Sequence, residues 1–168
     1  TEIMNCTSHG VTNGNGDRQH FLGCDIHDNA GAGYRQTFNA TGVATIFEHC
    51  IFDTNSYGFQ NTHTSGQKYY FFNCDFVDNT NDGIEFSGAS AVIRLGIENC
   101  IFYGNGGYGV DLSDTLANND GRCLVNRNNA YGSNTSGTRD LLSAGTADVA
   151  LTADPFADKA GRNFALNT

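Results

Sequence analysis

The stretch ENCIFYGNGGYGVDL, residues 98–112, places an asparagine five residues after a cysteine and a glycine four residues after that asparagine. Closely similar spacing recurs in GCDIHDNAGAGYRQ (23–36), HCIFDTNSYGFQN (49–61) and NCDFVDNTNDGIEF (73–86). Recurrence of one spacing along a chain is the signature of repeat architectures, in which each repeat forms one structural unit. The question is therefore which unit needs a cysteine, an asparagine and a glycine at these offsets.

The cysteines set the length of the repeat. Six are present, at intervals of 18, 26, 24, 26 and 23 residues, and five of them are followed by an asparagine five residues later. The predicted cysteine column consists of Cys6, Cys24, Cys50, Cys74, Cys100 and Cys123. The predicted asparagine column consists of Asn29, Asn55, Asn79, Asn105 and Asn128. We therefore expect a repeat domain over residues 1–137.

Each repeat has the pattern of three short strands separated by turns. A cysteine and the residue two positions later lie on the same side of a strand, because side chains alternate between its two faces. A second strand follows each glycine, and a third precedes each cysteine, as in YYFF (69–72). Three strands in about 24 residues describe one coil of a parallel β-helix. A β-sandwich is the competing fold, but it would not keep one side-chain register through five repeats.

These patterns predict an all-β fold, a single-stranded right-handed parallel β-helix solenoid of about five to six coils. The right-handed winding is expected because crossover connections between parallel strands are almost always right-handed. Stacking puts equivalent residues about 4.8 Å apart, so cysteines would fill the interior and asparagine amides would bond along the stack. Disulfides between parallel side chains would be strained, so we expect reduced, buried thiols. No CxxC motif is present and the five histidines are scattered, which argues against a zinc site.

Composition excludes several classes of partner. The formal net charge is -9, which disfavours binding to the phosphates of nucleic acid and to anionic membranes. No apolar run approaches the roughly 18 residues of a membrane-spanning helix. Partners of another kind, other protein subunits or a polysaccharide, are compatible with this charge.

Two segments resemble a known family. IENCIFYGNGGYGVDL (97–112) and YFFNCDFVDNTNDGIEF (70–86) resemble the repeat of right-handed parallel β-helix proteins of the pectate-lyase-like group. That group includes polysaccharide lyases and hydrolases, phage tailspikes and many secreted or virion proteins. The tail DVALTADPFADKAGRNFAL (148–166) resembles the closing segment of β-helix proteins from marine bacteria and their phages. The resemblance implies the fold and leaves the function open, because one fold hosts many roles.

One outward-facing column of residues could carry chemistry. It consists of the residues two positions after each turn glycine, Arg35, Gln60, Glu85 and Asp111. Carboxylates about 5 Å apart are the arrangement of a retaining glycosidase, so Glu85 and Asp111 are candidate catalytic residues. The same two could instead bind Ca²⁺ together with Asp82 and Asp114. Simple polar alternation on an exposed sheet face is the plainer explanation, and Arg35 lies too far from Glu85 for a pectate-lyase-like mechanism.

The repeat stops near residue 138, and we predict that residues 138–168 form a C-terminal cap or a docking segment. The regular stack and the lack of a convergent acid–base–metal cluster favour a structural or adhesive protein, in a virion or on an extracellular surface, that assembles with other subunits. The alternative is a polysaccharide lyase, a glycoside hydrolase or a carbohydrate-binding β-helix. We expect no cofactor, and calcium is the one alternative.

Overall fold

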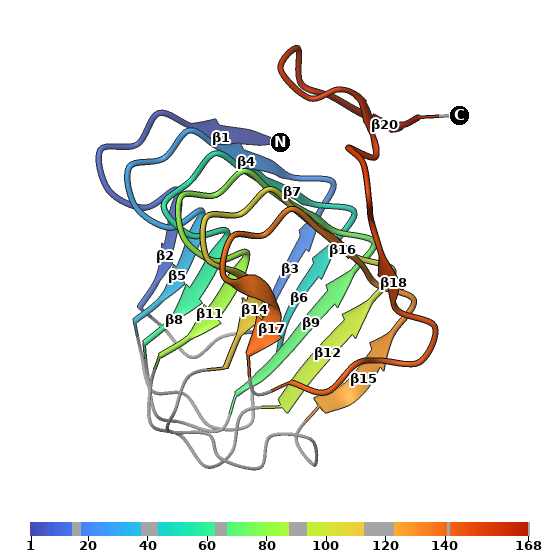
Figure 1. The fold of residues 1–168 in the computed structure, drawn as a ribbon. Coiled ribbons are helices and arrows are strands. Elements are labelled where there is room, and N and C mark those ends of the chain that lie inside the picture. The colour runs from blue at the N-terminus through green and yellow to red at the C-terminus, as the bar shows by residue number, and fades with distance from the viewer. Residues whose placement is uncertain are drawn as a thin grey trace.

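The computed structural model describes residues 1–14, 18–37, 44–62, 67–87, 94–112, 123–140 and 142–167. In these ranges the chain forms twenty strands and no helix, and all but the last two strands belong to three parallel sheets (Figure 1). Successive strands pass from one sheet to the next and then return to the first, one position further along. The predicted all-β parallel solenoid is confirmed.

The three sheets form the three sides of the solenoid. Sheet A contains β1 (Glu2–Met4), β4 (Asp25–His27), β7 (Ile51–Asp53), β10 (Asp75–Val77), β13 (Ile101–Tyr103), β16 (Ala130–Gly132) and β18 (Val149–Ala150). Sheet B contains β2 (Val11–Asn13), β5 (Tyr34–Gln36), β8 (Phe59–Asn61), β11 (Ile84–Phe86), β14 (Tyr108–Asp111) and β17 (Gly137–Asp140). Sheet C contains β3 (Gln19–Leu22), β6 (Ala44–Glu48), β9 (Lys68–Phe72), β12 (Arg94–Glu98) and β15 (Cys123–Arg127).

The number of coils agrees with the prediction of five to six. In the described part of the chain, five coils each contribute one strand to all three sheets. Sheets A and B carry additional strands, β16, β17 and β18, after the last complete coil.

Aromatic side chains fill the interior in columns that follow the strand register. In sheet A the middle residues of consecutive strands stack with ring centroids 4.8 Å (Phe52–Phe76), 5.0 Å (Phe76–Phe102) and 4.9 Å (Phe102–Tyr131) apart. These separations match the distance of about 4.8 Å between neighbouring strands. Each ring is buried, so the period-2 alternation of the sequence becomes one continuous core.

Two turns of every coil place a residue in the left-handed region, which explains the many asparagines, aspartates and glycines. The turn between sheets C and A uses Gly23, His49, Asn73, Asn99, Asn128 and Ala147, with φ between 52° and 60°. The turn after each sheet-A strand uses Asn5, Asp28, Thr54, Asp78, Gly104 and Ser133, with φ between 49° and 74°. Most of these are residue types that tolerate positive φ, so local sequence and global winding agree.

Four of the six cysteines stand in one column, directly before the sheet-A strands. Their carbonyls accept hydrogen bonds from the first residue of the next sheet-A strand, as Cys50 does from Asp75 (2.9 Å). The column consists of Cys24, Cys50, Cys74 and Cys100, all buried and none in a disulfide. The placement of the outer two cysteines in this column is corrected. Cys6 lies beside Asn29, and Cys123 pairs with Leu95 in sheet C.

The asparagine ladder has one member that differs from the prediction. Asn29, Asn55, Asn79 and Asn105 stack, but the next rung is Asn134, whose Oδ1 accepts a 2.8 Å hydrogen bond from Asn105 Nδ2. Asn128 instead occupies the left-handed turn, with φ 56°. The error has a physical cause. Counting five residues on from Cys123 assumes that this cysteine stands directly before a sheet-A strand, as the other column cysteines do, but Cys123 lies in sheet C. The coil from Ile101 to its partner Ala130 is also longer than the preceding coils.

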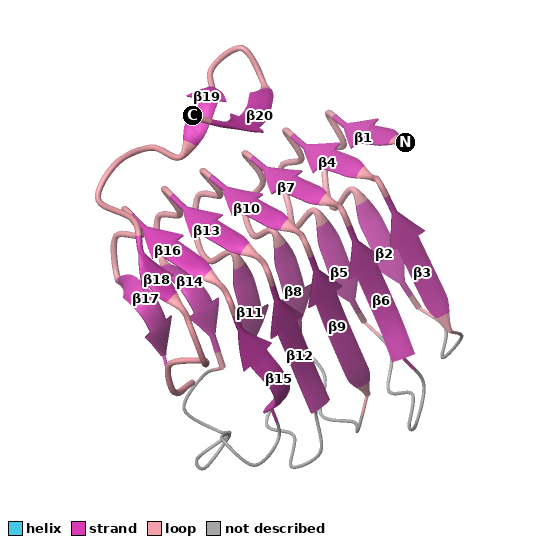
Figure 2. Cartoon of the chain, turned by 90° about the vertical axis from the view of Figure 1, so that its right-hand side faces the viewer, coloured by secondary structure: helices cyan, strands magenta, loops and turns pink. Residues whose placement is uncertain are grey.

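The chain after residue 137 first continues the solenoid and then leaves it. β17 pairs in parallel with β14, and β18 pairs in parallel with β16, so the coils extend beyond the predicted boundary. An antiparallel hairpin follows, formed by β19 (Phe156–Asp158) and β20 (Asn163–Leu166), and it lies against the side of the solenoid (Figure 2). Phe156 packs with Val77 and Tyr103 in a small apolar cluster on the outside of sheet A.

Candidate functional site

The outer face of sheet B carries the column of polar residues predicted from the sequence. Parallel pairing places Arg35 beside Gln60, Gln60 beside Glu85, and Glu85 beside Asp111. Their neighbours along each strand are buried in the core, namely Tyr34, Phe59, Ile84 and Val110. The structure therefore brings Glu85 and Asp111 together as adjacent, half-buried rungs on the outer face of sheet B. We call this row, from Arg35 to Asp111, the sheet-B row.

The sheet-B row changes in charge along its length. At one end the Arg35 guanidinium contacts His9, with Nη1 and Nε2 2.8 Å apart. In the middle Gln60 Nε2 donates a 2.7 Å hydrogen bond to Glu85 Oε2. At the other end Asp111 pairs in register with Asp140 of β17. The row therefore runs from a basic end through an amide to a carboxylate-rich end.

A second row flanks the first, on the turn that leads into each sheet-B strand or at the first residue of the strand. It contains Tyr57, Asp82 and Tyr108, whose carbonyls accept hydrogen bonds from the glycines of neighbouring coils. Asp82 Oδ1 also accepts a 2.6 Å hydrogen bond from the backbone N–H of Tyr108, which fixes this carboxylate between the coils. Two tyrosines and an aspartate therefore border the acidic end of the sheet-B row. We call these three residues the flanking row.

Burial makes these acids unusually easy to protonate. It raises the pKa of Asp82 to about 6, with further contributions from the charges of Asp111 and Glu85. Burial also raises the pKa of Glu85, although the hydrogen bond from Gln60 opposes the shift. The pKa of the Tyr57 phenol is raised by burial and by the carboxylates of Glu85, Asp82 and Asp111. The site can therefore both donate and accept hydrogen bonds near neutral pH.

Three of the four predicted calcium ligands, Asp82, Glu85 and Asp111, lie in the described part of the chain. In the described part of the chain, the carboxylate oxygens of Asp82, Glu85 and Asp111 do not form a group within 4.8 Å of one another. The fourth candidate, Asp114, lies outside the described residues. Glu85 and Asp111 are neighbours in register, and Asp82 lies on the adjacent turn.

Two thiols at the centre of the cysteine column are held in the protonated form. Burial raises the pKa of Cys74 well above its ordinary value, and a neighbouring thiol together with burial raises the pKa of Cys50. Because the thiolate is the nucleophile and the metal ligand, these side chains serve as packing residues of the interior.

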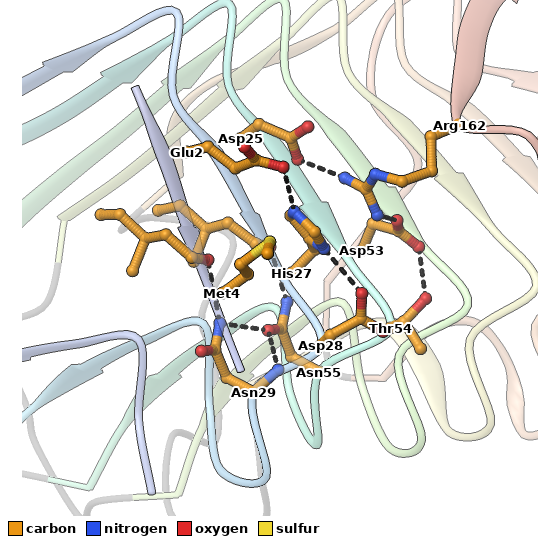
Figure 3. Close-up of polar contacts among 12 residues, drawn as sticks. Glu2, Met4, Asp25, His27, Asp28, Asn29, Asp53, Thr54, Asn55 and Arg162 are labelled. Atoms are coloured by element: carbon orange, nitrogen blue, oxygen red, sulfur yellow. Dashed lines mark hydrogen bonds and ion pairs between the residues drawn. The ribbon is translucent and has the colours of Figure 1, made fainter. Parts of the chain in front are cut away.

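A second polar cluster was missed at the level of the sequence. The five histidines are scattered along the sequence, but His27 is buried, with only 4% of its side chain exposed. It contacts Glu2 and Asp28, and the C-terminal hairpin brings Arg162 onto Asp25 and Asp53 (Figure 3). The alternation of Asp25 and His27 in one short strand was the signal available, since it puts both on one face.

The comparison with known families agrees with this architecture. Residues 1–95 match a family model described as a right handed beta helix region. The chain belongs to this right-handed β-helix family. No curated protein and no solved structure matches it. In the part of this β-helix that the structure describes, no helix has the length and apolar character needed to cross a membrane.

Proposed function

We propose that this β-helix is a non-enzymatic adhesive protein that binds a linear polysaccharide along the outer face of sheet B. The observation that supports the proposal is the sheet-B row, in which polar side chains repeat in strict register on one face. Parallel strands repeat about every 4.8 Å, which is close to the length of one sugar unit in an extended chain. A polymer lying across the strands would meet one set of polar groups per coil.

The side chains supply the contacts that sugars need. Gln60, Glu85 and Asp111 offer amide and carboxylate groups for hydroxyls, and the half-buried rings of Tyr57 and Tyr108 offer apolar faces for pyranose rings. Carboxylates dominate one end of the row, so a neutral or amino-substituted polymer fits it better than a polyuronate, which like charges would repel.

Rigidity supports an adhesive or structural role. The asparagine ladder and the stacked aromatic column couple each coil to the next, so the outer face of sheet B is held in one geometry. It therefore loses little conformational entropy when a ligand binds. We propose a virion or an extracellular surface as the setting and assembly with other protein subunits, because rigid display of a binding face suits attachment. Size-exclusion chromatography with light scattering tests the assembly, and a monomer at high concentration contradicts it.

Affinity electrophoresis tests binding directly. The wild-type chain should be retarded in gels containing a neutral or an amino-substituted polysaccharide, and less so in gels containing a polyuronate. Glu85→Gln should weaken retardation at least fivefold. Glu98→Gln is the matched control, because it removes the same charge from the outer face of sheet C. No retardation in any gel, or equal loss in both variants, would refute the assignment of the binding face.

A hydrolase is the second candidate, favoured by one observation. Glu85 and Asp111 are adjacent in register, and the pKa of nearby Asp82 is about 6, so an ionised and a protonated acid can coexist. A glycosidase needs such a pair. The adhesive proposal predicts that the wild type releases no reducing ends from a polymer that it binds. If the wild type releases reducing ends and Glu85→Gln does not, the protein is a hydrolase and not an adhesive protein. The outer face of sheet B would remain the binding site.

A further inference from the structure

We propose that Glu2, Asp25 and His27 form a binding site for a divalent transition-metal ion of the Zn²⁺ type, on the outer face of sheet A. The site lies on the first two strands of that sheet, β1 and β4, and is separate from the sheet-B row. One imidazole and two carboxylates are a ligand set that Zn²⁺ accepts, with a fourth position left for water.

Strand register brings the three ligands together. Glu2 pairs with Asp25, and Met4 pairs with His27, so Glu2, Asp25 and His27 lie on one face of neighbouring strands. One ligand atom from each lies within 4.8 Å of the other two, and His27 Nε2 is 2.9 Å from Glu2 Oε1 (Figure 3). Ligand bonds of about 2.0–2.2 Å around one ion require only small rotations of these side chains.

The surroundings of His27 match those of a metal-ligating histidine. Its other nitrogen, Nδ1, lies 2.7 Å from Asp28 Oδ2. A proton on Nδ1 that is donated to Asp28 leaves the Nε2 lone pair directed at Glu2 and Asp25. Such a partner fixes the tautomer and the ring orientation, and a carboxylate is one of the acceptors, with backbone carbonyls and water, that almost all metal-ligating histidines use. Burial of the ring, 4% exposed, holds that orientation.

The local charge favours a cation. Four carboxylates surround the imidazole or its neighbours, those of Glu2, Asp25, Asp28 and Asp53. The C-terminal hairpin supplies one guanidinium, that of Arg162, whose Nη2 lies 2.6 Å from Asp25 Oδ1 and whose Nη1 contacts Asp53. Arg162 thus bonds one oxygen of Asp25 and orients the carboxylate, and the other oxygen can serve the ion. The Glu2 side chain is 59% exposed, which gives the ion a path from solvent.

The test is calorimetric titration of the full chain with ZnCl₂, followed by Co²⁺ absorption spectroscopy. We expect one Zn²⁺ per chain and Co²⁺ bands of nitrogen and oxygen ligation without thiolate charge transfer. His27→Gln should lower the affinity at least tenfold, and Asp28→Asn should lower it about 10–100-fold. His20→Gln is the matched control, because His20 forms an exposed pair with Glu48 at 3.2 Å and should bind metal only weakly.

A second pair of substitutions distinguishes a loss of Zn²⁺ binding from a loss of folding. Glu2→Gln alters an exposed side chain, and Asp25→Asn keeps an oxygen for Arg162, so both should retain the circular dichroism spectrum of the wild type. Both should still lose Zn²⁺ affinity. No stoichiometric Zn²⁺ binding by the wild type, undiminished binding by folded Glu2→Gln and Asp25→Asn, or thiolate bands with Co²⁺ would each overturn the site.

Discussion

Replacing Asn79 by alanine should destabilise the solenoid strongly, because this residue is a central rung of the buried amide ladder. Its Oδ1 accepts hydrogen bonds from the backbone N–H and the Nδ2 of Asn55, at 3.1 and 3.3 Å. Its Nδ2 donates to the carbonyl of Phe52 at 3.0 Å and to Asn105 Oδ1 at 2.9 Å. Four lost bonds, each contributing about 0.5–1.5 kcal/mol, predict a loss of about 2–6 kcal/mol in the free energy of unfolding.

The measurement is urea unfolding followed by circular dichroism, with Asn128→Gly as the matched control. Asn128 is exposed and in the left-handed region, so glycine adopts its backbone angles and the free energy of unfolding should change by about 0.5 kcal/mol or less. This comparison also tests which asparagines form the ladder. A cost below about 1 kcal/mol for Asn79→Ala, or an equal cost for both variants, would refute the assignment of stability to the ladder.

Three further predictions concern the pH dependence, the turns and the hairpin. Burial raises the pKa of Asp75 to about 7, so between about pH 4 and pH 7 the folded state binds a proton that the unfolded state has lost, and the free energy of unfolding should fall as the pH rises from about 4 to about 7. Asp75→Asn should reduce this fall in thermal midpoints measured across that range. An unchanged slope in the variant would count against the role of Asp75. A Cβ on Gly83 would lie 2.6 Å from the carbonyl oxygen of Gly109, so Gly83→Ala should lower the free energy of unfolding by about 1–3 kcal/mol in urea titrations, and a neutral result would contradict the close packing of the coils. Phe156→Ala removes the ring that packs on Tyr103 and Val77, so limited proteolysis should cut the chain faster after residue 150, while cleavage within the strands of the three parallel sheets should not change; unaltered cleavage after residue 150 would mean that the ionic contacts alone hold the hairpin.

The sequence predicts the solenoid because its coils repeat both residue type and side-chain alternation. Positions such as Phe52, Phe76 and Phe102 identify the core column without any tertiary information. Register is harder to predict at the ends of the repeat. Cys6 is only 18 residues from Cys24, too few for a coil, and it stands beside Asn29. Spacing between like residues is therefore a reliable guide only where it equals the length of a coil.

The two candidate sites differ in how far the sequence reveals them. The sheet-B row follows from alternation after each turn glycine, so Glu85 and Asp111 could be placed side by side from the sequence. The cluster around His27 could not, because Arg162 and Asp53 are 109 residues apart and meet only when the hairpin folds back over sheet A. Long-range docking of a segment outside the repeat has no periodic signal in the sequence.

The central claim, that the outer face of sheet B is the binding surface, is tested most directly by hydrogen–deuterium exchange. Exchange is compared for the free chain and for the chain saturated with the polysaccharide that retards it most. We predict added protection in peptides covering residues 57–61, 82–86 and 108–112, which carry Gln60, Glu85 and Asp111 of the sheet-B row together with the flanking row. Exchange in 44–48 and 68–72 of sheet C should be unchanged. Protection centred on sheet C, on the hairpin or nowhere would contradict it.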